Sequence, residues 1–159
     1  MTPRPATAAD FPFIRRLAGH PDYEPFITDE DEAALATYLA EPTSLLQIWE
    51  TNGQAAGFAL WCGINAPSGA VELRRLALAS TGGGKGLTFV RALTDFGFQN
   101  LQAQRIWLDA SAENPRAARV YQQAGYTLEG RQRAHWFRPA LGRNVDLLLF
   151  GMLRSEWQG

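Results

Sequence analysis

The chain has 159 residues, of which 46% are hydrophobic and 19% are charged, a composition typical of one globular domain rather than of a disordered segment. The single cysteine, Cys62, excludes an internal disulfide framework and a cysteine-based zinc cluster. No apolar run approaches the roughly 18 residues of a membrane-spanning helix, and the N-terminus lacks the pattern of a secretory signal. We therefore expect a single domain, residues 1–159, in the cytoplasm and without a membrane partner.

The net charge of −1 is unevenly divided along the chain. Residues 1–70 carry three basic and nine acidic side chains, whereas residues 71–159 carry twelve basic and seven acidic ones. This overall balance disfavours polyanion binding, so we expect no nucleic-acid partner. The division suits an anionic ligand at the C-terminal half and a cationic one at the N-terminal half, although chance clustering of solvated charges is the simpler explanation.

The N-terminal part predicts a short strand followed by two helices. Thr7 and Asp10 have the spacing of a capping box at the start of the first helix, which continues to Gly19. The aromatic segment His20–Thr28 predicts a loop, because its two prolines are incompatible with helix. The four acidic residues 29–32 then favour the positive end of a second helix.

The pattern next changes to strands. Asn52-Gly53 between two apolar runs is the strongest short-range signal of a β-hairpin. A glycine-rich loop at 80–86 leads into the helix Leu87–Phe98, and Asn114-Pro115 combines a capping residue with proline at the first position of a last helix. The predicted strands are Thr2–Pro5, Leu45–Glu50, Gln54–Cys62, Ala70–Leu78, Arg105–Ala110, Tyr126–Phe137 and Val145–Leu153.

The element order is therefore β-α-α-β-β-β-α-β-α-β-β. Consecutive hairpins require antiparallel pairing, whereas each strand–helix–strand unit requires a right-handed crossover. The expected fold class is mixed α/β (α+β), with a mostly antiparallel twisted sheet of about seven strands and helices on both faces. Ligands of such sheets bind where a strand ends against a helix N-terminus, which draws attention to the glycine-rich loop.

That loop, Ala79–Gly86, has the sequence ASTGGGKG. Its glycines let consecutive amides point into one concavity, and the following helix N-terminus adds partial positive charge, which suits a pyrophosphate. A Walker A loop is excluded because Lys85 is followed by glycine, so a nucleotide hydrolase is disfavoured. A dinucleotide fingerprint fits poorly, because that motif opens the first βαβ unit. On glycine content alone, a flexible connector is equally compatible.

Three segments resemble the GNAT superfamily of acyl-CoA-dependent N-acetyltransferases. VELRRLALASTGGGKGLTFVRAL resembles its acetyl-CoA pyrophosphate motif, and WLDASAENPRAARVYQQAGYTLEG resembles its Asn-x-x-Ala-x-x-x-Tyr-x-x-x-Gly-Phe/Tyr pattern. The closing GRNVDLLLFGMLRSEW is similar to the tail of the ribosomal-protein-alanine and spermidine acetyltransferase branch. The resemblance covers essentially the whole chain and implies a GNAT-like fold.

The resemblance implies acetyl-CoA as co-substrate and no metal. In the loop, Gly83 stands where the superfamily has a long polar side chain, and Thr88 where it has a tiny residue, but the backbone amides that bind the pyrophosphate survive both changes. The backbone before the loop would bind the pantetheine amides as a pseudo-strand. The implied cofactor contacts are Leu76, Ala77, Leu78, Gly83, Gly84, Lys85, Gly86, Leu87, Thr88, Asn114, Arg119 and Tyr121.

Acetyl transfer to an amine requires loss of the ammonium proton, polarisation of the thioester carbonyl and protonation of the leaving thiolate. The resemblance implies direct attack by the amine, with Tyr121 as the acid for the thiolate and Glu72 as the base. The simpler alternatives are a packing role for Tyr121 and an ion pair of Glu72 with Arg74 or Arg131. Other candidates for the base are Asp22, Glu24 and His135.

The aromatic loop is the expected acceptor site, with Tyr23, Glu24 and Phe26 as contacts, because acids attract an amine cation and aromatic rings pack around it. The sequence leaves open a protein N-terminus, a polyamine or another small amine, and the tail resemblance favours the N-terminal-amine branch slightly. A non-catalytic acyl-CoA-binding or regulatory module is the alternative. A homodimer paired through a sheet edge is also open, with no residue that argues for it.

Overall fold

The computed structural model describes all residues, 1–159, and its seven strands form one sheet in the order β1-β2-β3-β4-β5-β7-β6. The strands are β1 (Thr2–Pro5), β2 (Ser44–Thr51), β3 (Gln54–Cys62), β4 (Ala70–Leu78), β5 (Arg105–Ser111), β6 (Thr127–Arg138) and β7 (Arg143–Leu153). The helices are α1 (Phe11–Ala18), α2 (Glu32–Ala40), α3 (Lys85–Gln99) and α4 (Pro115–Gln123). The predicted element order and fold class are confirmed.

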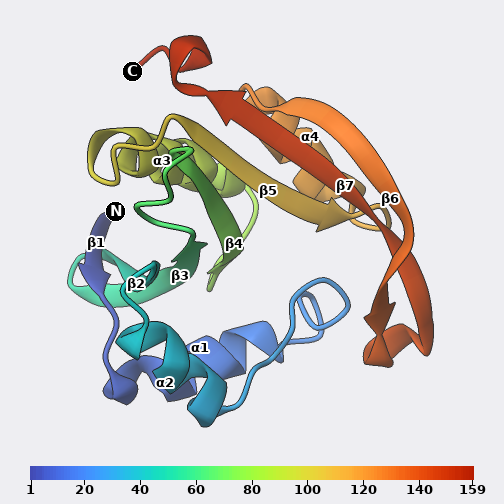
Figure 1. Cartoon of the computed structure of the whole chain (residues 1–159). Coiled ribbons are helices and arrows are strands. Elements are labelled where there is room, and N and C mark those ends of the chain that lie inside the picture. The colour runs from blue at the N-terminus through green and yellow to red at the C-terminus, as the bar shows by residue number, and fades with distance from the viewer.

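Helices cover both faces of the twisted sheet, with α1 and α2 on one side and α3 and α4 on the other (Figure 1). Alternate residues of β3 show the two faces, because Phe58 and Leu60 pack with α1 and α2 whereas Trp61 packs with α3. Close approach of α3 to the sheet depends on Gly97, where a Cβ atom would lie 2.6 Å from Ile106 Cδ1. No helix combines the length and the apolar character that crossing a membrane requires.

Neighbouring strands are antiparallel except for β4 and β5, whose parallel ladder is short. The ladder ends at the pair Glu72 and Trp107, although β4 continues to Leu78 and β5 to Ser111. A β-bulge leaves Arg74 as an extra residue on β4 opposite β3, and bulges bend their strand. The two central strands therefore separate, and the far part of β4 has an edge without a strand partner.

The start of the second helix differs from the prediction. Only Asp31 and Glu32 stand at the helix start, where the Asp31 carboxylate accepts a hydrogen bond of 2.8 Å from the Ala34 amide. Asp29 and Glu30 precede the helix and form ion pairs with Arg15 and Arg75 instead. The local charge pattern misassigned them because their partners lie on α1 and β4.

Candidate active site

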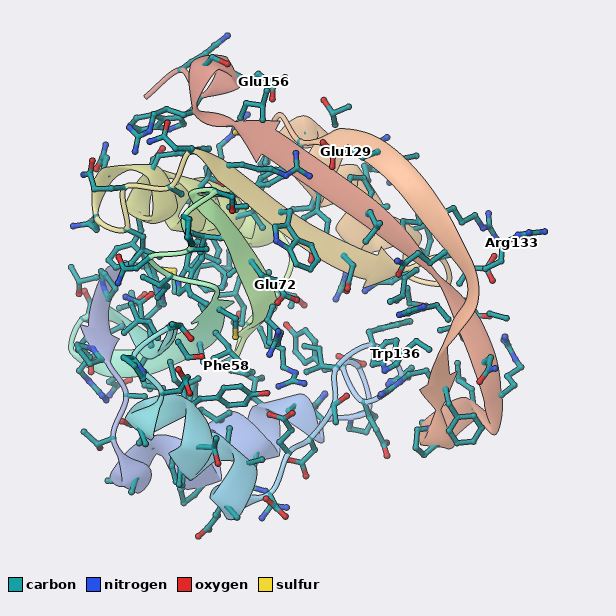
Figure 2. The ribbon with its side chains drawn as sticks, in the orientation of Figure 1. Phe58, Glu72, Glu129, Arg133, Trp136 and Glu156 are labelled. Atoms are coloured by element: carbon teal, nitrogen blue, oxygen red, sulfur yellow. The ribbon has the colours of Figure 1, made fainter.

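A cavity of about 580 Å³ opens where β4 and β5 separate. Its wall combines β4, the glycine loop, the first turn of α3, β5 and α4 with the loop after α1 and part of β6. Figure 2 shows Glu72 on β4 and Trp136 on the β6–β7 hairpin, two of the side chains that line it. A volume of this size is within the range of small-molecule sites.

The structure brings most of the predicted cofactor residues to this cavity. Those that line it are Leu76, Ala77, Leu78, Gly84, Gly86, Leu87, Asn114 and Tyr121. Gly83, Lys85, Thr88 and Arg119 do not line it. Lys85 donates to the Ser80 hydroxyl at 2.9 Å, and the Thr88 hydroxyl donates to the Gly84 carbonyl at 3.3 Å, so both side chains bond within the loop. Arg116 lines the cavity where Arg119 was expected.

The glycine loop has the backbone of an anion cradle. Gly82, Gly83 and Gly84 all have positive φ, at 92°, 55° and 79°, which side-chain-bearing residues rarely adopt in succession. The first-turn amides of α3, including those of Gly86 and Leu87, follow directly and have no intrahelical acceptor. The free amides and the positive end of the α3 dipole together fit a pyrophosphate. The loop therefore fits the pyrophosphate group of acetyl-CoA.

The open edge of β4 has free backbone groups at Leu76, whereas those at Leu78 are already bonded. The Ala79 amide donates to the Ala56 carbonyl on β3, so Ala79 faces β3. Because the backbone groups of successive strand residues point to opposite sides, those of Leu76 and Leu78 point to the open edge. The Tyr23 hydroxyl donates to the Leu78 carbonyl at 2.7 Å and accepts from the Leu78 amide at 3.2 Å. Leu76 therefore remains available to pantetheine, whereas Tyr23 holds both backbone groups of Leu78.

Tyr121 is buried on α4, and its ring contacts the rings of Phe150 and Tyr126. The packing alternative is therefore correct for the ring, but the hydroxyl makes no hydrogen bond within the protein and the residue lines the cavity. Burial raises the pKa of Tyr121 well above its ordinary value, and the negative charge of Asp109 raises it further. The phenol is thus held protonated, as a proton donor must be.

Glu72 lines the cavity but is already paired. Arg74 donates to the Glu72 carboxylate through two nitrogens, at 2.6 and 3.0 Å. Arg131, the other partner considered, pairs instead with Asp146. The Glu72 carboxylate therefore enters the site as half of an ion pair.

Asp109 on β5 is a carboxylate that sequence reasoning missed. It lines the cavity, is half-buried and forms no hydrogen bond or ion pair with its side chain. Burial raises its pKa to about 6, and Glu72 adds to this, while His135, Arg74 and Arg75 partly oppose it. The available signal was alternation along RIWLDA, which directs an acidic side chain away from the apolar face of the strand.

At the acceptor end, Tyr23 and Phe26 line the cavity, whereas Glu24 is exposed and does not. Arg138, buried at the end of β6, donates to the carbonyls of Pro25 and Ile27 at 3.0 Å each, and also to the carbonyl of Glu24. Through these hydrogen bonds, Arg138 connects the loop after α1 to the β6–β7 hairpin. Its partners lie more than a hundred positions away in the chain, and no sequence signal identified it.

Among the other candidates for the base, His135 lines the cavity from a bulge of β6, whereas Asp22 is exposed beside His20 and outside it. No group of three or more histidine, cysteine, aspartate or glutamate side chains is arranged to hold a metal ion. The site therefore offers one carboxylate without a partner, the unpartnered phenol of Tyr121 and the backbone groups of the glycine loop and of Leu76.

The family model described as an acetyltransferase (GNAT) domain matches residues 1–127. Three solved structures of spermidine N-acetyltransferase from Vibrio cholerae are similar in fold. Its complex with CoA and spermine has a TM-score of 0.85 and 21% identity, covering 98% of this chain and 96% of that chain. A chimera of that enzyme with hSSAT has a TM-score of 0.83 and 22% identity, covering 97% of this chain and 95% of the chimera. A dodecameric form has a TM-score of 0.78 and 21% identity, covering 97% of this chain and 94% of that chain. With the family model matching most of its length, the chain belongs to the GNAT acetyltransferase family and transfers an acetyl group from acetyl-CoA to an amine.

Proposed function

We propose that a primary amine attacks the thioester directly in the cavity between β4 and β5. In this proposal Asp109 accepts the proton of the amine and Tyr121 donates a proton to the leaving thiolate. One observation carries this proposal: a phenol held protonated and an unpaired carboxylate line the same cavity as the open edge of β4. A neutral amine is itself the nucleophile, so no nucleophilic side chain is needed.

The cofactor end of the cavity supports the binding of acetyl-CoA by main-chain groups. The positive-φ glycines and the first turn of α3 would hold the pyrophosphate, and the backbone of Leu76 would bond a pantetheine amide. The Asn114 side-chain oxygen accepts from the Ala117 amide at 3.1 Å, which leaves its NH2 group free to donate to the pantetheine arm. Arg116, rather than Arg119, is the arginine of α4 that lines the cavity.

Tyr121 is the proposed acid, because its hydroxyl has no partner in the protein and stays protonated at neutral pH. Asp109 is the proposed base in place of Glu72, because a base needs a free carboxylate with a pKa near the working pH, and Glu72 is bound to Arg74. If Glu72 were the base, removing Arg74 would increase activity and removing Asp109 would leave it unchanged.

Cofactor binding is tested by thermal unfolding with and without saturating acetyl-CoA, with ATP and NAD as controls. At about a hundred times its dissociation constant, a ligand of the folded state adds roughly 2.7 kcal/mol. For a chain of this size we expect acetyl-CoA alone to raise the melting temperature by about 5–10 °C. An unchanged melting temperature would refute the proposed use of the glycine loop.

Catalysis is tested by thiol release from acetyl-CoA in the presence of amines. The complex of the Vibrio cholerae enzyme with spermine makes polyamines one arm of that screen, next to small monoamines and peptides with a free N-terminus. We expect Asp109→Asn to reduce kcat/KM by at least a hundredfold and Glu72→Gln to reduce it far less. The reverse order would assign the base to Glu72.

Self-association and cytoplasmic location stay predictions. β1 and β6 are the two edge strands, and β6 offers twelve residues of largely exposed strand. A homodimer through β6 would use that edge. Size-exclusion chromatography with light scattering measures the mass, and a monomer at all concentrations would exclude the dimer.

A further inference from the structure

We propose that the acceptor is a monoamine: a primary amine with a single positive charge attached to an apolar body of about the size of an aromatic ring. This inference rests on the proposed function and specifies its acceptor. It follows from the charges of the cavity wall, from the state of its aromatic rings and from the apolar side chains near Asp109.

Positive charge outweighs negative charge on the wall of the cavity. The acidic side chains are Glu72 and Asp109, and the arginines are Arg74, Arg75 and Arg116. Glu72 is neutralised by Arg74. Asp109 is therefore the one carboxylate that can receive an ammonium group, and a second or third ammonium would enter a partly desolvated site without a partner, which is costly.

The ion pair of Arg75 does not make the cavity more attractive to a positively charged amine. Its guanidinium donates to Glu30 at 2.6 Å, and Glu30 is itself bound by the Tyr38 hydroxyl outside the cavity wall. The pair is neutral overall, but its positive half is the part that lines the cavity. A polyamine extending from Asp109 toward β4 would meet that positive half.

The Trp136 ring does not compensate for the missing carboxylates. The guanidinium carbon of Arg138 lies 4.0 Å from the centre of the Trp136 ring, so one face of this ring already holds a cation. Trp136 lines the cavity on the β6–β7 hairpin (Figure 2). The fixed charge of Arg138 on this ring would repel an ammonium group, so Trp136 is a poor site for a second charge of the acceptor.

Apart from the charged groups of β4 and His135, apolar side chains line the acceptor side of the cavity. Leu147 of β7 is on the same face of the sheet as Asp109, because its partner across the ladder is Ser111, two residues further along β5. Phe26 and Ile27 of the loop after α1 line the same cavity, and Arg138 fixes the backbone of that loop. An ammonium on Asp109 would therefore carry its body onto Leu147, Phe26 and Ile27.

The acceptor test compares kcat/KM, by thiol release, for 2-phenylethylamine, ethylamine, spermidine, spermine and the amide of Phe-Gly-Gly. We expect 2-phenylethylamine to exceed spermidine and spermine by at least tenfold, and ethylamine to fall below it for lack of an apolar body. The peptide shares the same chemistry, and its rank against 2-phenylethylamine tells a small amine from a chain end. A polyamine equal to or better than 2-phenylethylamine would overturn the inference while leaving the proposed function intact.

Two variants check the physical reasons. Phe26→Ala should raise KM for 2-phenylethylamine by about tenfold and leave ethylamine nearly unchanged, whereas the matched Phe137→Ala, at an exposed ring outside the cavity, should change neither. Arg74→Gln frees the Glu72 carboxylate and should shift selectivity toward spermidine by roughly tenfold. Equal losses for both amines in Phe26→Ala would overturn the apolar contact. Thiol release with none of the amines would overturn the proposed function together with this inference.

Discussion

Replacing Asp109 by asparagine should stabilise the fold at neutral pH while it removes the base. The pKa of Asp109 is raised from 3.8 to about 6, mainly by burial, so the folded state keeps a proton that the unfolded chain releases. Stability therefore falls as the pH rises from about 4 to about 6, and the loss is complete above that window. An asparagine carries no charge and does not suffer this loss.

The magnitude follows from the size of the shift. A difference of about two pKa units corresponds to about 3 kcal/mol, and the partial exposure of the side chain together with the unpaired amide of asparagine reduces the expected gain to about 1–2 kcal/mol. For a chain of 159 residues this is an increase of about 2–8 °C in melting temperature. The groups that face Asp109 are Glu72, Arg74 and Arg75 on β4 and His135 on β6, and the pH window includes their influence.

The assay is thermal unfolding of the wild type and the Asp109→Asn variant at pH 4 and pH 8. We expect the gain at pH 8 and almost none at pH 4, where Asp109 is protonated in the folded protein. Asp146→Asn is a matched control of opposite sign, because hydrogen bonds from the Ala134 amide and from Arg131 lower the pKa of Asp146, so its charge supports the fold. A variant that melts no higher than the wild type at pH 8 would show that Asp109 is not a desolvated carboxylate, and the base assignment would fail with it.

Further variants test other parts of the structure. Tyr121→Phe should lower kcat by about 10²–10⁴-fold in the thiol-release assay and keep the thermal shift with acetyl-CoA. Arg138→Met should raise KM for the amine about tenfold with a small effect on kcat, and Arg138→Lys should recover part of it. Arg154→Met, which removes an arginine that donates to carbonyls outside the cavity, should lower the melting temperature without altering KM. Gly97→Ala should cost about 1–3 kcal/mol in chemical denaturation, because the new methyl group meets Ile106.

Local signals were sufficient for the fold. Asn52 and Gly53 both have positive φ, at 53° and 73°, as the hairpin turn between β2 and β3 requires. Asn114 caps α4 by accepting from the Ala117 amide, and the Asp10 carboxylate accepts from the Thr7 amide at 2.8 Å. Each of these contacts joins residues within four positions of one another, so the sequence contains both partners in one short segment.

The backbone geometry of the glycine loop was predictable for the same reason, and the directions of the neighbouring polar side chains were not. Gly82, Gly83 and Gly84 have positive φ, which glycine permits whatever lies around it. Lys85 and Thr88 follow these glycines in the first turn of α3, but their side chains bond to Ser80 and Gly84 and do not line the cavity. The sequence places a polar side chain near the loop, whereas its direction depends on which partner is nearest in three dimensions.

The two carboxylates of the cavity show where prediction from sequence reaches its limit. Glu72 and Asp109 both lie on strands near the point where β4 and β5 separate, and the motif spacing favoured Glu72. Arg74 binds Glu72 from two positions away, so this pair was visible in the sequence. The freedom of Asp109 depends instead on what lies opposite it, and the register of β5 with β7 puts Leu149 there. A basic side chain at that position would have paired Asp109 and lowered its pKa, so the chemistry of the site depends on a strand register set some forty residues further along the chain.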